Sequence, residues 1–318
     1  MDLKDIYSPI SRELNRVEQV LKASLKNGSN KSMLEVVNHI LASPGKRIRP
    51  ALVILSARAS HNGFSDKLAK IAAAVELIHI ASLVHDDIID HASLRHNKPT
   101  INSKWGQDIA IALGDYLYSE AFRLVAECEN ADIISCISLA TKAMCEGELL
   151  QVCERNNLKL LKEHYIVTIK KKTAGLFIAS CKSGAMLVGS NRIIHSALEE
   201  YALNFGIAFQ ITDDCLDLIA DEKNLGKAPG ADFKVGELTL PVLNLILKSK
   251  DRKEIISLLK QPDRQDAFKD LREKFINSEA LVKTEEDIAS YVSKAKAPLK
   301  KLGNSCFKQS LYLLADYI

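Results

Sequence analysis

Apolar side chains recur at intervals of three and four residues along almost the whole chain, and the strict alternation typical of strands is scarce. This spacing places the apolar side chains on one face of a helix. The pattern therefore predicts an all-α fold, interrupted by Gly and Pro in SPGKRIRP, LRHNKPT, LVGSN and LGKAPGADFKVGE. The predicted helices span residues 3–26, 32–42, 50–60, 65–91, 104–129, 131–155, 158–185, 192–220, 239–248, 252–259, 264–276 and 278–317, the last with interruptions.

Two of the predicted helices each carry three aspartates: Asp86, Asp87 and Asp90 in LVHDDIID, and Asp213, Asp214 and Asp217 in QITDDCLDL. Because residues four apart share a helix face, the first and third aspartate of each cluster project together and the second lies to the side. Carboxylates among aliphatic side chains are costly to desolvate unless a cation neutralises them. Mg²⁺ takes one or two carboxylates and completes its shell with water and phosphate oxygens. The repeated cluster therefore favours a magnesium–diphosphate site between two helices over a solvated acidic face.

Cationic side chains gather in the predicted loops, where a diphosphate group would need them. In SPGKRIRP they surround Gly45 just before a helix begins, and cations at a helix N-terminus are typical of an anion receptor. For this segment alone, a solvated basic turn is the alternative. The candidate cations are Lys46 and Arg49 in SPGKRIRP, Arg95 in LRHNKPT, Lys172 in IKKKTAGLF and Lys227 in LGKAPG.

Composition narrows the class of protein further. The chain of 318 residues is 47% hydrophobic with a net charge of only +3, which predicts one globular domain over residues 1–318 and no nucleic-acid partner. Seven scattered cysteines without a CxxC pair favour reduced thiols. With neither a signal peptide nor a charge-free apolar run long enough for a bilayer, we expect a cytoplasmic protein with at most peripheral membrane contact.

The order of motifs along the chain resembles that of the trans-type (all-E) polyprenyl diphosphate synthases over nearly the whole length. The motifs are GKRIRP, DDIID, LRHNKPT, ALGDYL, KKTAGL, FQITDDCLD and LGKAPGADF followed by TLP. The resemblance implies an isoprenoid synthase fold, a single large helical bundle around a central cavity, in a homodimer that uses Mg²⁺. It also implies that isopentenyl diphosphate is condensed with an allylic diphosphate after the allylic C–O bond ionises.

The resemblance assigns roles to individual residues. Magnesium is expected on Asp86, Asp90, Asp213 and Asp217, with Asp87 and Asp214 beside them. The allylic diphosphate is expected on Arg95, Lys172 and Lys227, with Thr173 and Gln210 next to it. Isopentenyl diphosphate is expected on Gly45, Lys46, Arg49, His79 and His96. The residues expected to act in catalysis are Asp86, Asp90, Lys172, Gln210 and Asp213.

Small side chains precede the first aspartate cluster, and they bear on product length. Ala81 and Ser82 lie five and four residues before Asp86, about one turn below the metals, with Ile78 a further turn down. Short-chain members of the family generally carry a bulky aromatic residue there. The small residues favour a long-chain product for quinone side chains, heptaprenyl to decaprenyl and preferably octaprenyl. A farnesyl or geranylgeranyl diphosphate synthase is the alternative, because small residues also serve close helix packing.

Two positions depart from the family pattern. His96 stands where a second arginine is usual, and Glu237 stands where many members have a lysine. Both changes predict weaker substrate binding unless Lys98 and Lys234 compensate, so His96→Arg is expected to lower the KM for isopentenyl diphosphate. A class I terpene cyclase and a subunit of a heteromeric synthase are the other readings. Terpene cyclases usually replace the second aspartate cluster with a different pattern, and such subunits usually lose one of the clusters. This chain keeps both.

Overall fold

The structure is a computed structural model that describes residues 2–26, 31–42, 45–61, 65–95, 97–220, 229–261 and 264–318. Its elements are α1 (Leu3–Tyr7), η1 (Ser8–Ile10), α2 (Ser11–Lys26), α3 (Lys31–Leu41), α4 (Ile48–Ser60), α5 (Asp66–Ile89), β1 (Leu94–Arg95), β2 (Lys98–Pro99), α6 (Ile101–Trp105), α7 (Gln107–Ala126), α8 (Ala131–Cys153), α9 (Lys162–Ile169), η2 (Lys170–Ala174), α10 (Gly175–Leu187), α11 (Arg192–Ile219), α13 (Ala231–Val235), α14 (Leu240–Lys248), α15 (Arg252–Leu259), α16 (Arg264–Ile276), α17 (Glu279–Lys296), η3 (Ala297–Lys301) and α18 (Cys306–Asp316).

The all-α prediction is confirmed, with differences where turns are short. The helix expected over 158–185 begins at Lys162 and contains the π-helical turn η2. The helix expected over 104–129 is divided at Gly106 into α6 and α7. The short helix α13 and the two-residue strands β1 and β2, which form an antiparallel hairpin, were not predicted. These elements are too short for a repeating apolar pattern to indicate them.

The two helices that carry the aspartates begin with strong caps and are buried along much of their length. The Ser65 side chain accepts a hydrogen bond from the Leu68 N–H at the start of α5, and the Asn191 side chain accepts from two N–H groups at the start of α11. Helix α5 is long and apolar enough to cross a bilayer, but 67% of the apolar window is buried inside the fold. This burial is typical of the core helix of a soluble bundle.

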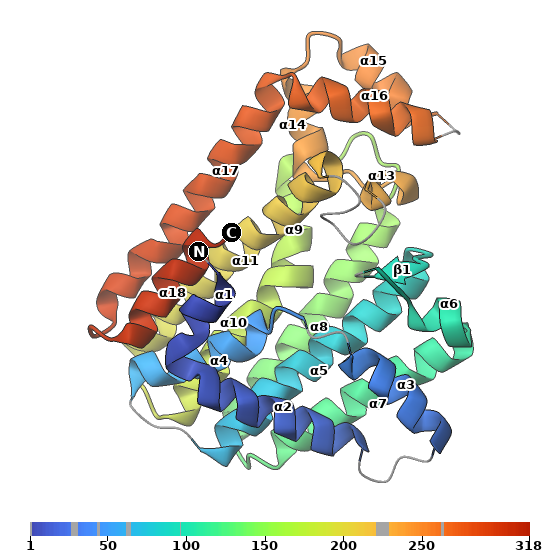
Figure 1. Ribbon diagram of the computed structural model, residues 1–318. Coiled ribbons are helices and arrows are strands. Elements are labelled where there is room, and N and C mark those ends of the chain that lie inside the picture. The colour runs from blue at the N-terminus through green and yellow to red at the C-terminus, as the bar shows by residue number, and fades with distance from the viewer. Residues whose placement is uncertain are drawn as a thin grey trace.

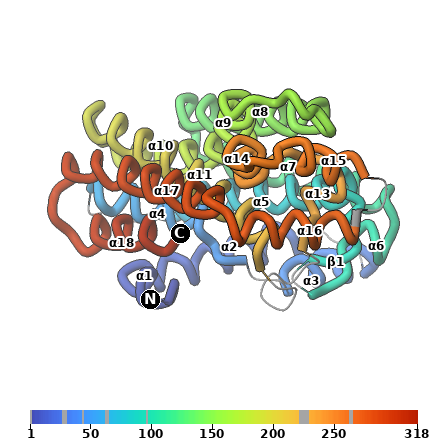
Figure 2. Tube along the Cα trace, turned by 90° about the horizontal axis from the view of Figure 1, so that it is seen from above, coloured from blue at the N-terminus to red at the C-terminus, as the bar shows by residue number. Residues whose placement is uncertain are grey.

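Figure 1 shows α5, α8, α10 and α11 running through the middle of the molecule, with α13 to α16 at one end. Helix α5 packs on α4 and α7, and α10 packs on α4, α8 and α11. Figure 2 shows α8 and α9 along one side of the molecule, with α1 and α18 towards the opposite side. Helix α18 contacts α1, where the Ser310 hydroxyl donates to the Ile6 carbonyl.

Two buried apolar clusters meet along α11. The first contains side chains of α5, α7, α8, α10 and the first half of α11, including Phe205. The second contains side chains of α9, α13 to α16 and the second half of α11, including Ile211 and Leu218. The aspartates of α11 therefore lie beside the second cluster, whereas those of α5 follow the first. The candidate site forms where the two clusters adjoin.

Candidate active site

A cavity of about 490 Å³ lies between α5, α8, α9 and α11. Carboxylates from four separate parts of the chain line it, together with the side chains of Lys172 and Arg95. Its acidic lining residues are Asp86, Asp90, Glu148, Glu154, Asp213, Asp214, Asp232 and Glu237. The two aspartate clusters thus contribute to one space, as their position on apolar helices suggested.

The first aspartate cluster divides between two spaces. Asp86 and Asp90 line the cavity, whereas Asp87 lines a neighbouring pocket. Asp87 accepts hydrogen bonds from Arg95 Nε at 2.8 Å and forms an ion pair with Arg95 Nη2 at 2.7 Å. Asp87 therefore holds an arginine that lines both spaces, which places it behind the cavity wall as its helical position predicted.

The second cluster differs from the predicted arrangement. Asp213 and Asp214 line the cavity, but Asp217 does not. Asp217 is buried, and its Oδ2 accepts the backbone N–H of Asp232 at 3.3 Å. A regular helix places Asp217 on the face of Asp213, but Gly230 and Asp232, at the start of α13, lie over this turn and donate their backbone N–H groups to the Asp217 carbonyl and carboxylate. This placement corrects the expectation that Asp213 and Asp217 face the open site together.

Asp214 is held in the cavity wall by hydrogen bonds from two neighbouring side chains. The Tyr165 hydroxyl donates to Oδ2 at 2.5 Å, and Gln210 Nε2 donates to Oδ1 at 2.7 Å. Gln210 in turn accepts from the Thr173 hydroxyl at 2.6 Å, so the predicted neighbours Gln210 and Thr173 are brought together. Burial raises the pKa of Asp214 to about 7, although both hydrogen bonds oppose the rise.

Lys172 enters the cavity from the π-helical turn η2. Such turns are rare and occur frequently at functional sites. Gly147 of α8 permits the close approach, because a Cβ there would lie 2.4 Å from the Lys172 backbone nitrogen. Lys172 Nζ pairs with Glu148 at 2.5 Å. The nearby carboxylates of Asp86 and Glu148 raise the pKa of Lys172 against the opposing effect of burial, so the ammonium stays charged at neutral pH.

A second pocket of about 320 Å³ adjoins the cavity and shares six lining residues with it: Arg49, His79, Leu83, Arg95, Phe209 and Asp213. Gly45, Lys46 and Lys98 also line this pocket. The residues expected to bind isopentenyl diphosphate are therefore brought together, apart from His96, which lies outside the described residues. Asp213 stands at the junction of the two spaces.

Arg49 is a buried cation without a carboxylate partner in hydrogen-bonding range among the described residues. Its guanidinium lies 4.4 Å from the centre of the Phe177 ring, and its Nε has no hydrogen-bond partner there. Burial lowers the pKa of Arg49 to about 10. An anion entering the second pocket would meet a charge that is largely desolvated already. Its neighbour Arg47, by contrast, is bound by Glu18 and Glu76.

His79 shares the wall of both spaces with Arg49. Burial lowers the pKa of His79 well below its usual value, and the charges of Arg49, Arg95 and Arg47 lower it further. The imidazole is therefore neutral at physiological pH. It can donate one N–H to an anion without adding a charge.

The cavity is lined by more carboxylates than lysine and arginine side chains. The Asp86 side chain forms no ion pair or hydrogen bond with the described residues, and desolvation raises its pKa to about 7. Glu148 and Asp90 add to that rise, while Lys172 opposes it. The described part of the chain holds no group of three or more His, Cys, Asp or Glu side chains able to enclose a metal ion. The donor set fits a hard divalent ion that takes few protein oxygens and completes its shell with water and phosphate.

The residues expected to control product length lie at different depths. Ser82 lines the cavity, and its hydroxyl donates to the His79 carbonyl at 2.8 Å. Ala81 and Ile78 are fully buried and do not line the open space. Both residues therefore lie in the packed core and not on the cavity wall where they were expected. Tyr118 and Met144, from α7 and α8, line the cavity instead.

Of the two positions that depart from the family pattern, the structure describes only Glu237. Glu237 lines the cavity and pairs with Arg155 at 2.8 Å. Lys98 lines the second pocket, where its Nζ donates to the Ala42 carbonyl, whereas Lys234 is exposed and lines neither space. Lys227, like His96, lies outside the described residues.

Several residues that line or support the cavity were not predicted from the sequence. Glu148 follows Met144 by one helical turn on α8, so the criterion that selected the aspartates, an acid on an apolar face, could have found it. Arg155 and Tyr165 carry no comparable signal. Their roles depend on carboxylates that lie 65 and 49 residues away in the chain.

An all-α bundle with an acid-lined cavity and an adjoining cationic pocket defines an enzyme of the isoprenoid synthase fold. A family model described as polyprenyl synthetase matches residues 30–275. The chain is 33% identical to a short chain isoprenyl diphosphate synthase of Methanothermobacter thermautotrophicus, over 100% of this chain and 98% of that protein. It is also 33% identical to heptaprenyl diphosphate synthase component 2 of Bacillus subtilis, over 100% of this chain and 90% of that protein.

Among solved structures, the fold is similar to the polyprenyl synthase from Caulobacter crescentus complexed with calcium and isoprenyl diphosphate. The TM-score is 0.93 at 32% identity, and the match covers 99% of this chain and 97% of that chain. The chain belongs to the polyprenyl synthetase family and is a prenyltransferase.

Proposed function

We propose that this enzyme condenses isopentenyl diphosphate head-to-tail with an allylic diphosphate and that it requires Mg²⁺. The single observation that carries the proposal is the pair of adjoining spaces, one lined by carboxylates and the other by cations, with Arg95 and Asp213 in their shared wall. The first space suits a metal-bound diphosphate, and the second suits a diphosphate bound directly by cations. The similar Caulobacter protein was solved with calcium and isoprenyl diphosphate, which supports this assignment.

The chain's own groups hold the two substrates and stabilise charge. Asp86, Asp90 and Asp213 would hold Mg²⁺, which when bound supplies positive charge to a departing diphosphate. Lys172 and Arg95 would bind the oxygens of that leaving group, where negative charge accumulates as the allylic C–O bond breaks. Arg49, Lys46 and His79 would orient isopentenyl diphosphate so that its double bond attacks the allylic carbon.

We further propose a long-chain product, heptaprenyl to decaprenyl, that serves a quinone. The proposal depends on Ser82, the small side chain by which α5 borders the cavity. Relatives named for short-chain and for heptaprenyl products have equal identity to this chain, so overall similarity does not discriminate between lengths. A shorter geranylgeranyl product is the alternative, and Tyr118 and Met144 are the residues that would impose it.

The surface of α7 and α8 supports a homodimer. Seven of the fifteen large apolar side chains that are exposed in the described part of the chain lie on these two helices: Ile109, Ile111, Ile134, Leu139, Leu149, Leu150 and Val152. Exposed apolar side chains gathered on two helices favour an interaction site there. We propose a second copy of the chain as its occupant. Because one relative is named as a component of its synthase, a different subunit is the alternative.

Analytical ultracentrifugation tests the dimer. Wild-type protein should sediment as a dimer at micromolar concentration, and Leu139→Glu, at a side chain that is 62% exposed, should sediment as a monomer. Wild-type protein that remains monomeric and inactive until a second subunit is added would favour the heteromeric alternative.

The proposed reaction is tested with Mg²⁺, farnesyl diphosphate and labelled isopentenyl diphosphate, followed by chromatography of the dephosphorylated products. A synthase gives a ladder of longer labelled prenyl alcohols. A terpene cyclase would release hydrocarbon without incorporating the label, and a non-catalytic subunit would leave both substrates unchanged. Either of these outcomes contradicts the proposal.

A further inference from the structure

Arg155 connects the first aspartate cluster to the loop that contains Glu237. It follows α8, and its Nη2 donates to Asp90 Oδ1 at 2.6 Å and to Glu237 Oε1 at 2.8 Å. Its Nη1 donates to the Ile89 carbonyl at 3.2 Å, in the last turn of α5. A cation at this position also interacts favourably with the negative end of the helix dipole. One guanidinium thus binds the end of α5 and a carboxylate from a distant part of the chain.

Glu237 is arranged to hold this arginine. Its side chain is 6% exposed, accepts from Arg155 Nε at 3.0 Å and also accepts a hydrogen bond from Gln151. The backbone adds a further connection, because Asn156 N–H donates to the Gly236 carbonyl at 2.7 Å. Gly236 has a φ of 82°, and a Cβ there would lie 2.2 Å from Asn156 Oδ1, so the two turns approach closely.

We propose that Arg155 is a positioning residue for Asp90 and that Glu237 acts through Arg155. The Asp90 side chain is partly exposed on the cavity wall, and Arg155 binds only Oδ1. Oδ2 is therefore left to bind a divalent cation, because the hydrogen-bond partners of metal ligands usually fix the orientation of the ligand. Glu237, at a position where many family members have a lysine, therefore positions a metal ligand and binds no substrate. This inference rests on the proposed function.

The test measures binding of Mg²⁺ and inorganic pyrophosphate by isothermal titration calorimetry, so it does not depend on turnover. Arg155→Ala should weaken Mg²⁺-dependent pyrophosphate binding about 10-fold, the lower end of the range for partners of metal ligands. Pyrophosphate binding in EDTA should be unchanged, because the cations that bind phosphate directly remain in place. A general structural defect would weaken both. Arg155→Lys, which keeps one hydrogen bond to Asp90, should give an intermediate affinity.

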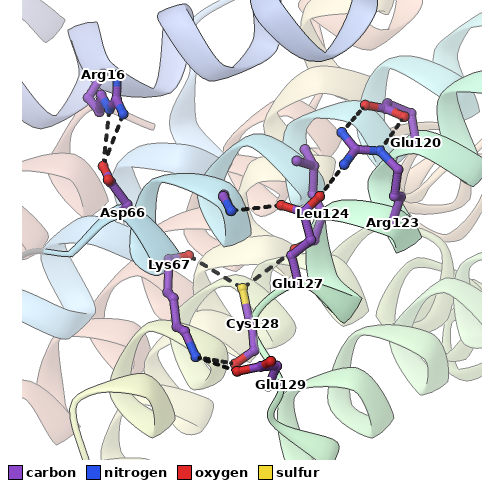
Figure 3. A network of polar contacts seen from close by, with 10 residues as sticks. Arg16, Asp66, Lys67, Glu120, Arg123, Leu124, Glu127, Cys128 and Glu129 are labelled. Atoms are coloured by element: carbon purple, nitrogen blue, oxygen red, sulfur yellow. Dashed lines mark hydrogen bonds and ion pairs between the residues drawn. The ribbon is translucent and has the colours of Figure 1, made fainter.

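A double-mutant cycle tests whether Glu237 acts through Arg155. Glu237→Gln should weaken Mg²⁺-dependent binding in the wild-type background but have no further effect when combined with Arg155→Ala. The matched control is Arg123→Ala. Arg123 also pairs with two carboxylates, Glu120 and Glu127, but lies in the network of Figure 3, away from the cavity. The control should bind as the wild type does.

Wild-type or tighter Mg²⁺-dependent binding by Arg155→Ala would overturn the proposal, since tighter binding would mean that Arg155 competes with the cation for Asp90. A full effect of Glu237→Gln in the Arg155→Ala background would overturn the indirect role of Glu237. If Arg155→Ala does not fold, Arg155→Lys and Glu237→Gln decide, and wild-type affinity in both contradicts the proposal. Wild-type protein that fails to bind Mg²⁺ and pyrophosphate would instead contradict the proposed function.

Discussion

The two ends of α5 use charge in opposite ways. At its N-terminal end, shown in Figure 3, Asp66 pairs with Arg16 at 3.2 Å, and the Lys67 ammonium pairs with Glu129 at 3.3 Å. At its C-terminal end, Asp86 has no such partner among the described residues, and its pKa is raised to about 7. The first end satisfies its charges with the protein alone. The second end pairs Asp87 and Asp90 with arginines but leaves the Asp86 carboxylate to be neutralised by a bound cation.

Replacing the central carboxylate should produce the largest difference between the two ends. Asp86→Asn is expected to lower kcat about 1,000-fold, because a group that holds charge for the transition state is lost. Asp66→Asn, the matched change at the other end, should leave kcat unchanged. Steady-state rates of label incorporation measure both variants. Equal loss of activity in the two variants would show that folding, and not the site, is affected.

Removing the buried cation of the second pocket should separate substrate binding from stability. Arg49→Met is expected to raise the KM for isopentenyl diphosphate about 30-fold, as expected when a buried charge loses its partner. Thermal stability should be unchanged or higher, because the desolvated guanidinium costs free energy in the empty pocket. Initial rates at varied isopentenyl diphosphate and a melting curve check both effects. A normal KM would remove Arg49 from the binding site.

The stability of the protein without divalent cations should report the cost of the unpaired carboxylate. Because the pKa of Asp86 is raised in the folded state, the native protein binds the extra proton between about pH 4 and 7. Ionised Asp86 therefore destabilises the fold most above pH 7, and Asp86→Asn should raise the free energy of unfolding there by up to about 4 kcal/mol. The gain should vanish as the pH falls towards 4. A gain that is independent of pH would refute the assigned cause.

Large side chains introduced at neighbouring positions of α5 should distinguish a position on the cavity wall from one in the core. Ser82→Phe should shorten the products, since Ser82 lines the cavity, while folding remains intact. Ala81→Phe should destabilise the protein by about 1–3 kcal/mol through overpacking, since Ala81 is fully buried. Product chromatography and denaturant unfolding distinguish the two. Shorter products from a fully stable Ala81→Phe enzyme would show that the cavity extends past Ala81.

The exposed ion pair at the N-terminal end of α5 should contribute least to the free energy of unfolding. Arg16 and Asp66 form an ion pair with side chains that are 47% and 73% exposed. Replacing either residue with Ala should change the free energy of unfolding by less than about 0.5 kcal/mol, since screened surface pairs contribute little. Urea unfolding of the two variants measures this. A loss of several kcal/mol would mean that both ends of α5 depend on their charges for stability.

The long helices could be predicted because a repeating apolar pattern over many turns determines which face is buried. The first aspartate cluster was placed correctly on the same basis, with Asp87 turned away towards Arg95. The position of Asp217 could not be predicted, because it depends on backbone N–H groups at the start of α13 that bind Asp217 at the end of α11. Arg155 escaped detection because its two partners come from distant segments, so only the folded chain brings the three together.

We propose that the carboxylates of α5 and α11 hold one diphosphate through divalent cations. Crystals grown with Mn²⁺ and an unreactive allylic thiodiphosphate, measured for anomalous scattering, test it most directly. We expect Mn²⁺ peaks between the diphosphate and the carboxylates of Asp86, Asp90 and Asp213. Anomalous peaks elsewhere, or a diphosphate bound in the cavity by cations alone, would contradict it.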